Sequence, residues 1–397
     1  MLREEAIAIS EKYYLPVFGR LPLVIDHGQG CKLYDMDGKE YIDFLDGIAV
    51  NCLGYNHPVI VKAVAEQAAK VMHTSNLFYN EIQAKAVRVI SEITGMDRIF
   101  LANSGAESNE GALKLARKYG HQKGGDGKYR IITAKMSFHG RTMATLTATG
   151  QPHYQEGYTP LPAGYDYIPF GDMEALEAAM GEDVCGLMLE PIQGEGGVHV
   201  PDKAYLEKAR ELCDKYDALL IFDEIQTGVG RTGNWFEYMN VGVKPDILTF
   251  AKGIGAGFPI GGFAVPEKLA RVFAPGDHGG TFGGNALACA VAYAVVTTLK
   301  AENIVPKVKE KGEYFFGKLQ ELQAKYPDKI KEVRGRGLLV GFEVNKPGAP
   351  IVNRCLEQGV IINCTVGNVI RMVPPLIVSK EEIDTVLAAL DVALAEF

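Results

Sequence analysis

An aspartate and a lysine each follow an apolar segment of this chain, where their side chains could share one site. Asp223 follows residues 219–222 (LLIF), and Lys252 follows residues 246–251 (DILTFA). Both segments have the length and composition of buried strands. In an α/β sheet, residues just past the carboxyl ends of the strands line the ligand crevice. We therefore expect Asp223 and Lys252 to face the same crevice.

This pair of side chains suits pyridoxal phosphate. The cofactor needs a lysine amine for its Schiff base and an acid that keeps its ring nitrogen protonated. Taken alone, an aspartate and a lysine at the rim of a sheet are more often a structural ion pair. The rest of the chain must decide between these two interpretations.

A possible phosphate site lies at residues 103–107 (NSGAE), between a strand-like segment and a helical one. The free N–H groups at the start of a helix, together with the helix dipole, can bind a phosphate. Gly105 would let the anion approach closely, and Ser104 could add a hydroxyl donor. Ser-Gly is also ordinary helix capping, so this segment alone leaves both possibilities open.

Five further side chains could face a ligand in the same crevice, one of them an acid, Glu195. Phe138 could stack on a cofactor ring, and Arg141 could hold a carboxylate through two parallel hydrogen bonds. Glu195 stands in a glycine-rich turn, and Thr281 precedes a helical segment where it could donate to a phosphate. Arg371 stands among apolar residues, where a second carboxylate site and an inter-domain salt bridge are equally good explanations.

Composition narrows the class of protein. With 397 residues, 47% of them hydrophobic, the chain can bury a large core and form two domains. A net charge of −8 without Lys/Arg-rich runs argues against nucleic acid and anionic membranes as partners. Seven scattered cysteines without a CxxC motif argue against disulfides and a zinc site. The first residues are charged, and no uncharged apolar run reaches the ~18 residues of a membrane span, so we expect a soluble cytoplasmic protein. We also expect no metal.

Strand-like and helical segments alternate through the middle of the chain. The strand-like segments are at 99–102, 130–133, 184–189, 219–222, 246–251 and 261–265, and the helical ones at 57–71, 81–94, 105–119, 172–180, 203–216 and 285–300. This alternation predicts an α/β fold with a mainly parallel sheet covered on both faces.

The two ends of the chain have a different pattern. They contain a hairpin-like stretch, a charged helix, a strand-like stretch and a final helix, at 31–44, 303–325, 337–344 and 380–395. We therefore expect a large domain over 54–300. Residues 1–53 and 301–397 together would form a smaller α+β domain.

Taken together and in this order, these segments resemble the class III, fold-type-I aminotransferases, which use pyridoxal phosphate. The resemblance extends over essentially the whole chain. Its segments are GIAVN at 47–51, HP at 57–58, TSNLFYN at 74–80, NSGAESNEGALKLA at 103–116, SFHGRT at 137–142, EPIQGEGG at 190–197, DEIQTG at 223–228, AKG at 251–253 and TFGGN at 281–285. Each motif is short, but the ordered set is specific, and it favours the catalytic interpretation throughout.

The resemblance implies cofactor roles for many of these residues. Lys252 would bind the cofactor covalently, Asp223 would pair with its ring nitrogen, and Gln226 would hydrogen-bond its phenolic oxygen. The other implied cofactor contacts are Ser104, Gly105, Ala106, Phe138, Glu224, Ile225 and Thr281. Thr281 is implied to reach the phosphate from a partner subunit, so the active site would require a homodimer.

The resemblance also implies two substrates in one site. The δ-amino group of N-acetylornithine would pass to 2-oxoglutarate, giving N-acetylglutamate semialdehyde and glutamate in arginine biosynthesis. Arg141 would hold the distal carboxylate of both substrates, and Arg371 only the α-carboxylate of glutamate. Glu195 would pair with Arg371 and swing away when glutamate binds. Further implied substrate contacts are Phe18 and Gly280.

Alternative amino donors remain open within the family. Ile48 stands where ornithine aminotransferases carry a tyrosine, and Phe18 where many relatives do. Both positions lack a hydroxyl that could serve a free α-amino group, which favours the acetylated donor. The main alternatives are ω-aminotransferases acting on succinylornithine, ornithine or 4-aminobutyrate. A glutamate 1-semialdehyde aminomutase or a non-catalytic dimeric scaffold is less favoured, the latter because Lys252, Asp223 and Gln226 are all present.

Overall fold

The central sheet dominates the structure, a computed structural model that describes residues 2–397. Its strands run in the order β4 (Arg98–Ala102), β10 (Gly261–Val265), β9 (Ile247–Phe250), β8 (Leu219–Asp223), β7 (Val184–Leu189), β5 (Arg130–Ala134) and β6 (Tyr165–Ile168). β10 runs antiparallel to both of its neighbours, and the other strands are parallel to one another. The prediction of a mainly parallel sheet is thus confirmed, with β6 as an additional strand.

Helices cover both faces of this sheet, which is why its central strands are apolar throughout. All residues of β8 are buried. Leu219 and Ile221 pack in the same cluster as α5 (Gly105–Gly124), whereas Leu220 and Phe222 belong to the cluster that includes α9 (Lys203–Lys215). Successive side chains of a strand point to opposite faces, so an uninterrupted apolar run supplies both layers. α8 (Met173–Ala179) packs on α9 and β6.

Three helices pack together next to strand β4. α11 (Ala286–Ala301) contacts α3 (Pro58–Ala68) and α4 (Glu81–Thr94), and it also contacts the short turn Lys252–Gly255. α11 is almost entirely apolar and buried, so it forms a rigid support beneath the turn that carries Lys252. Within residues 2–397, no single helix is long and apolar enough to cross a bilayer, and α11 meets that test only together with the next helix, at a bend of 69°.

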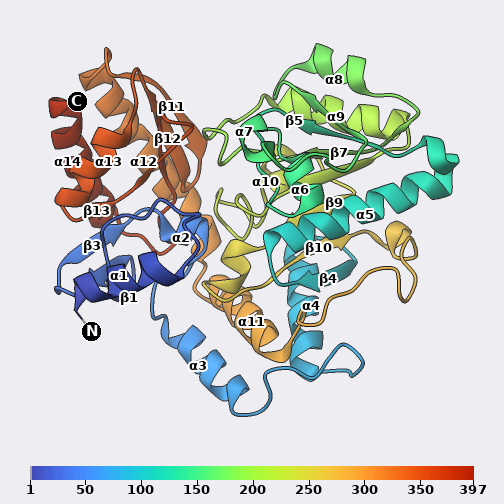
Figure 1. Cartoon of the computed structure of the whole chain (residues 1–397), viewed down its shortest axis with the longest axis horizontal. Coiled ribbons are helices and arrows are strands. Elements are labelled where there is room, and N and C mark those ends of the chain that lie inside the picture. The colour runs from blue at the N-terminus through green and yellow to red at the C-terminus, as the bar shows by residue number, and fades with distance from the viewer. Residues whose placement is uncertain (1) are drawn as a thin grey trace.

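The two ends of the chain meet in one sheet. β1 (Ile25–Gln29), β2 (Lys32–Asp35) and β3 (Glu40–Asp43) pair with β13 (Val360–Ile361), which runs parallel to β3. A second sheet has the order β11 (Ile330–Arg336), β12 (Leu339–Val344), β15 (Val369–Met372) and β14 (Asn363–Thr365). The helices of this part are α1 (Arg3–Tyr13), α12 (Ile304–Lys325), α13 (Ala349–Glu357) and α14 (Lys380–Glu396). Figure 1 shows the blue N-terminal segments beside the orange and red C-terminal ones, which agrees with a small domain built from both ends. The boundaries at 54 and 300 stay predictions.

Short helices hold the loops around the crevice. They are α2 (Asp46–Ala49), α6 (Met143–Ala148), α7 (Pro152–Gln155) and α10 (Glu237–Val241). α2 is unusual because all four of its residues have positive φ, including the β-branched Ile48 at 69°. A non-glycine residue in this left-handed region is strained, and such strain persists only where the surroundings enforce it. The next residue, Val50, lines the cavity described below.

Candidate active site

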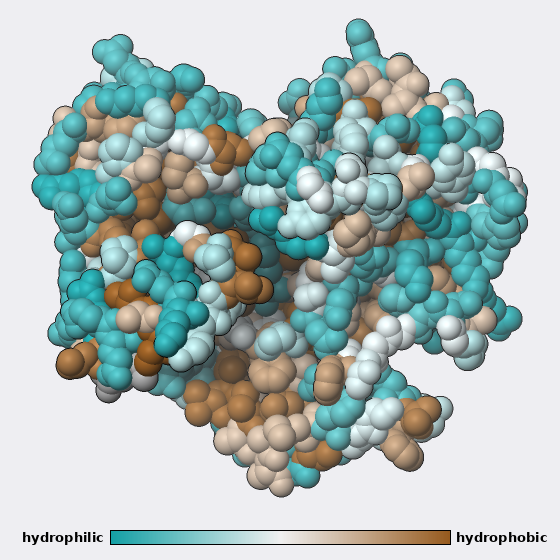
Figure 2. All heavy atoms as spheres, in the orientation of Figure 1, coloured by the Kyte–Doolittle hydropathy of each residue, from teal (hydrophilic) through white to brown (hydrophobic). Residues whose placement is uncertain are grey.

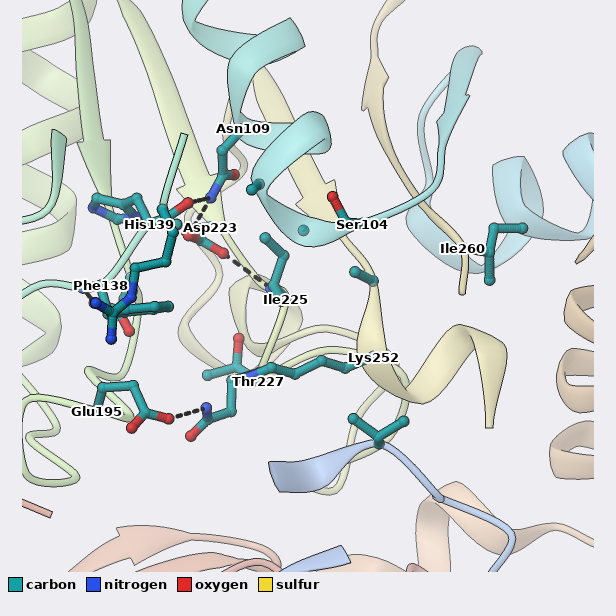
Figure 3. Close-up of a pocket in the computed structure, with 18 of the residues that line it drawn as sticks. Ser104, Asn109, Phe138, His139, Glu195, Asp223, Ile225, Thr227, Lys252 and Ile260 are labelled. Carbon is teal, nitrogen blue, oxygen red and sulfur yellow. Dashed lines mark hydrogen bonds and ion pairs between the residues drawn. The ribbon is translucent and has the colours of Figure 1, made fainter. Parts of the chain in front are cut away.

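A cavity of about 400 Å³ lies at the carboxyl-terminal edge of the central sheet. Residues just past β4, β5, β7, β8 and β9 line it, because these parallel strands end at the same edge. The predicted residues that line it are Ser104, Gly105, Ala106, Phe138, Arg141, Glu195, Asp223, Ile225, Gln226 and Lys252. Most of the predicted cofactor contacts, and two of the predicted substrate contacts, are thus brought together (Figure 3).

Asp223 is the most firmly held side chain of the cavity. Its Oδ2 accepts a hydrogen bond from Asn109 Nδ2 at 2.8 Å and lies 2.7 Å from Nδ1 of His139. Its Oδ1 accepts from the backbone N–H of Ile225 at 3.1 Å. The side chain is only 4% exposed. These contacts fix the orientation of the carboxyl group, so Asp223 can present an oxygen to a cationic ring nitrogen.

Lys252 begins the turn that follows β9, and its side chain extends into the cavity toward Thr227 (Figure 3). Its backbone has a positive φ of 48°, a strained conformation held by the packed turn. Enclosure lowers the pKa of the Lys252 amine; the negative charge of Glu195 raises it, Arg371 lowers it again, and the net shift is downward. A lowered pKa increases the fraction of neutral amine, which is the form that attacks a carbonyl or accepts a proton.

The start of α5 forms an anion-binding edge of the cavity. Ser104 caps this helix, its Oγ accepting from the N–H of Glu107 at 3.2 Å, so its own O–H remains available to donate. The N–H groups of Gly105 and Ala106 belong to the first helical turn, which lacks intrahelical acceptors. A Cβ on Gly105 would lie 2.9 Å from Cδ1 of Ile225, so a larger residue at this edge would force the Ile225 side chain to move.

A second charged group of the site is the pair of Glu195 and Arg371. Arg371 Nη1 lies 2.5 Å from Glu195 Oε1 and donates to Gln226 Oε1 at 3.1 Å, while Nε donates to Asn363 Oδ1 at 3.3 Å. Arg371 is fully buried, and within residues 2–397 its Nη2 has no hydrogen-bond partner. Burial alone would raise the pKa of Glu195, but the positive charges of Arg371 and Lys252 outweigh it and lower that pKa. The predicted pairing of Glu195 with Arg371 is therefore present.

Gln226 lines the cavity, but both the nitrogen and the oxygen of its side-chain amide already form hydrogen bonds. Its Nε2 donates to Glu195 Oε1 at 3.1 Å, and its Oε1 accepts from Arg371. The predicted contact of Gln226 with the cofactor's phenolic oxygen stays a prediction.

Glu224 requires a correction. It was expected among the cofactor contacts, but its carboxylate does not line the cavity. It accepts instead from Thr227 Oγ1 at 2.9 Å and from the N–H groups of Glu237 and Tyr238, which begin α10, at 2.6 and 2.8 Å. Burial raises the pKa of Glu224 to about 8. Its role is to fasten the 224–238 loop behind Asp223.

Four more predicted residues do not line the cavity of this chain, and of these only Arg371 contacts residues that do, namely Glu195 and Gln226. Phe18 is exposed in the segment after α1, and Gly280 and Thr281 are exposed in the segment before α11. For Phe18 and Gly280 the expected substrate contact is therefore not made within one copy. Thr281 was expected to serve a partner subunit, and that expectation stays a prediction.

Three buried residues that the sequence does not single out complete the site. Asn109 and His139 hold Asp223, and Glu190 accepts from the N–H groups of Phe138 and Gly194 at 3.0 and 3.2 Å. Burial raises the pKa of Glu190 to about 7. Asn109 stands four residues after Gly105 and so on the same face of α5, a spacing that could have indicated it.

These residues fit pyridoxal phosphate. A lysine with a lowered pKa, an aspartate held by hydrogen bonds and a helix start with free donors supply the three polar groups that the cofactor requires. Phe138 lies beside Asp223 at the same cavity, in place for a ring to stack on it.

Comparisons with known proteins agree with this chemistry. The family model for class-III aminotransferases matches residues 15–394. An acetylornithine aminotransferase of Methanocaldococcus jannaschii is 50% identical over 396 residues, covering 100% of this chain and 99% of the relative. Another, of Caldanaerobacter subterraneus subsp. tengcongensis, is 50% identical over 391 residues, covering 98% and 99%.

Solved structures show the same similarity. The ornithine aminotransferase of Toxoplasma gondii ME49 superposes with a TM-score of 0.95 at 36% identity, covering 100% of this chain and 96% of that one. The acetylornithine aminotransferase of Elizabethkingia anophelis superposes with a TM-score of 0.89 at 33% identity, covering 100% of both chains.

Proposed function

Because the chain belongs to the class III aminotransferase family, we propose that it transfers the δ-amino group of N-acetylornithine to 2-oxoglutarate. The products are N-acetylglutamate semialdehyde and glutamate, in a step of arginine biosynthesis. The observation that carries the proposal is the buried Arg371, which is paired with the cavity-lining Glu195 and retains one unpaired Nη2 among residues 2–397. Acetylornithine aminotransferases at 45–50% identity over nearly the full length support the choice of donor.

Within this site the residues divide the work. When bound, pyridoxal phosphate supplies an electron-withdrawing ring that stabilises the negative charge left when a proton leaves the substrate carbon. Asp223 keeps that ring nitrogen protonated through its fixed charge. Ser104 and the first N–H groups of α5 anchor the phosphate. Lys252 Nζ would hold the cofactor covalently and, as a free amine, would accept and return the proton that moves during the amino transfer.

Two substrates with differently placed carboxylates must use one cavity. Arg141 is proposed to hold the distal carboxylate in both half-reactions. Arg371 is needed only for the α-carboxylate of glutamate, which is next to the reacting carbon. N-acetylornithine reacts at its δ-amine and has no carboxylate at that position. An unpaired buried arginine would be costly when N-acetylornithine binds, and Glu195 removes that cost by remaining paired with it.

Replacing Arg371 should separate the two half-reactions. Arg371→Ala should weaken the glutamate half-reaction by roughly 2–5 kcal/mol, because a buried, charge-assisted contact to the α-carboxylate is lost. The N-acetylornithine half-reaction should change far less. Single-turnover spectra of the cofactor, recorded with one substrate at a time, measure each half separately.

Glu195→Ala is the matched variant for that experiment. It leaves Arg371 unpaired when N-acetylornithine enters, so glutamate should gain at the expense of N-acetylornithine. Equal losses in both half-reactions for Arg371→Ala would contradict the proposal that Arg371 serves glutamate alone.

A homodimer with shared active sites is part of the proposal. Segments 72–80 and 279–285 are joined by a hydrogen bond from Asn76 Nδ2 to Gly283 O at 2.9 Å. Gln83 of α4 connects them further, since its Nε2 donates to Asn76 Oδ1 at 2.9 Å and to Gly284 O at 3.0 Å. Together they expose large apolar side chains, namely Met72, Leu77, Phe78, Tyr79 and Phe282. Figure 2 shows hydrophobic side chains gathered around α3 and the loop after it, at the bottom of the view. Exposed large apolar side chains gathered in this way are typical of a protein interface, and Thr281 is exposed next to one of them, Phe282.

Mixed dimers would test the sharing of sites. Lys252→Ala and Thr281→Ala homodimers should each be impaired, since one lacks the catalytic amine and the other the phosphate contact from the partner. After subunit exchange, a hybrid contains one site with neither substitution, so activity should partly return. A control mixture of Lys252→Ala with Asp223→Asn should stay inactive, because one chain supplies both residues to its cavity and each site of the hybrid then carries one substitution. No recovery in the Thr281 mixture, despite proven subunit exchange, would contradict the role of Thr281 across the interface.

We also propose a cytoplasmic location. The cysteines are free, and all are buried except the half-buried Cys364. Free cysteines suit a reducing compartment, where the substrates of amino-acid biosynthesis are available.

A further inference from the structure

Arg141 is held in the cavity by aromatic rings. Its guanidinium carbon lies 3.9 Å from the centre of the Tyr154 ring and 5.6 Å from the centre of the Phe138 ring. No carboxylate of residues 2–397 lies within ion-pair distance of it. A cation is attracted to the face of an aromatic ring, and this attraction leaves its charge and its N–H donors free.

The two arginines of the site are therefore held by different means. Arg371 is paired with the carboxylate of Glu195, which must leave before a substrate carboxylate can take its place. Arg141 rests on Tyr154, which offers no hydrogen-bond acceptor at its ring face. A substrate carboxylate therefore meets no competitor at Arg141. This difference matches the proposed duties, since Arg371 serves one substrate and Arg141 serves both.

The ring beneath Arg141 has a firm base. Tyr154 lies on α7, whose Gln155 Nε2 donates to the carbonyl of Thr149 at 2.9 Å and to Tyr167 OH at 3.1 Å. The residue that precedes α7, Gln151, donates from Nε2 to the carbonyl of Ser137 at 3.0 Å, next to Phe138. The rings of Tyr154 and Phe138 are nearly perpendicular, at a centroid distance of 5.8 Å and an interplanar angle of 77°. α7 is thus fixed to the same loop that carries Phe138 and Arg141.

We propose that Tyr154 is a positioning residue that holds Arg141 in place for the substrate carboxylate. The inference rests on the proposed function, in which Arg141 binds the distal carboxylate of both substrates. A long, solvent-exposed arginine loses conformational freedom when it binds, and a ring that already orders it reduces that loss. Tyr154 thereby favours substrates that carry a carboxylate at the far end.

The test uses two replacements of Tyr154 and two amino donors. Tyr154→Leu removes the ring, whereas Tyr154→Phe keeps it as the matched control. N-acetylputrescine is N-acetylornithine without its carboxylate, so it cannot use Arg141. Single-turnover conversion of the cofactor-loaded enzyme by each donor, without 2-oxoglutarate, gives an apparent dissociation constant and a maximal rate.

We expect Tyr154→Leu to raise the apparent dissociation constant for N-acetylornithine roughly 3- to 30-fold, the range that a cation–π contact can supply. Its maximal rate, its kinetics with N-acetylputrescine and its cofactor spectrum should stay close to those of the parent. Tyr154→Phe should remain within about twofold for both donors, because phenylalanine keeps a ring face. Calorimetric binding of N-acetylnorvaline, which has the carboxylate but no δ-amine, should weaken by the same factor.

Arg141→Ala separates the inference from the function on which it rests. If Tyr154 acts through Arg141, Tyr154→Leu should add little to the loss in an Arg141→Ala background. No loss with N-acetylornithine in Arg141→Ala itself would overturn the role of Arg141, and the inference with it. A loss in Arg141→Ala but none in Tyr154→Leu would overturn the inference alone. Equal losses with both donors in Tyr154→Leu would also overturn it, because Tyr154 would then act on the cofactor or the fold.

Discussion

Lys252→Ala should abolish transamination while the protein stays folded. Lys252 begins the turn after β9, where α11 supports the backbone, so removal of its side chain leaves the packing of the turn unchanged. Its amine is proposed both to bind the cofactor covalently and to transfer the proton. No other lysine lines the cavity among residues 2–397. The loss should therefore approach the whole catalytic effect of the enzyme.

The assignment can be checked without relying on activity. Borohydride reduction of the cofactor-loaded enzyme, followed by peptide mapping, should place the cofactor on Lys252. Circular dichroism and the thermal midpoint of the apo form should match those of the parent. Label on a different lysine would defeat the assignment, whatever the activity of the variant.

Asp223→Asn should keep cofactor binding and lose most of the rate of the chemical step. The phosphate contacts at the start of α5 do not depend on Asp223, so affinity for the cofactor should fall little. A neutral amide cannot hold the ring nitrogen in its protonated form. The loss in the chemical step should be on the order of several kcal/mol, since a preorganised charge is removed from an enclosed site.

A cofactor analogue provides the control for Asp223→Asn. Pyridoxal phosphate methylated at the ring nitrogen carries its positive charge permanently, so it should restore part of the rate in the variant. It should not improve the parent enzyme. A near-normal kcat for Asp223→Asn with the ordinary cofactor would rule out the proposed role.

Much of the site could be predicted because its residues follow apolar strands. Asp223 and Lys252 each stand at the end of a buried run, and parallel strands bring such ends together at one edge. Arg371 and Glu195 are 176 residues apart, and only the packing of β15 against the loop after β7 makes them a pair. The family resemblance implies this pairing. Sequence spacing alone leaves two equally good explanations of Arg371, a second carboxylate site and an inter-domain salt bridge.

Residues that act through another side chain were harder to predict. A histidine in a loop does not by itself indicate which side chain it contacts. The contact of His139 with Asp223 forms only when the strands of the sheet are packed side by side. Glu224 illustrates the opposite error, since its position next to Asp223 suggested a shared role. Its carboxylate instead turns to the start of α10, where backbone N–H groups without helical partners hold it. In the small domain, β13 and β14 are too short to produce an alternating pattern.

The most direct test of the account is a comparison of amino donors with the purified enzyme and 2-oxoglutarate as acceptor. The donors are N-acetylornithine, N-succinylornithine, ornithine and 4-aminobutyrate, and the measured quantity is kcat/KM for glutamate formation. We predict the highest value for N-acetylornithine, with one glutamate formed for each N-acetylglutamate semialdehyde. A higher value for ornithine or 4-aminobutyrate, or no glutamate from N-acetylornithine, would contradict the proposed function.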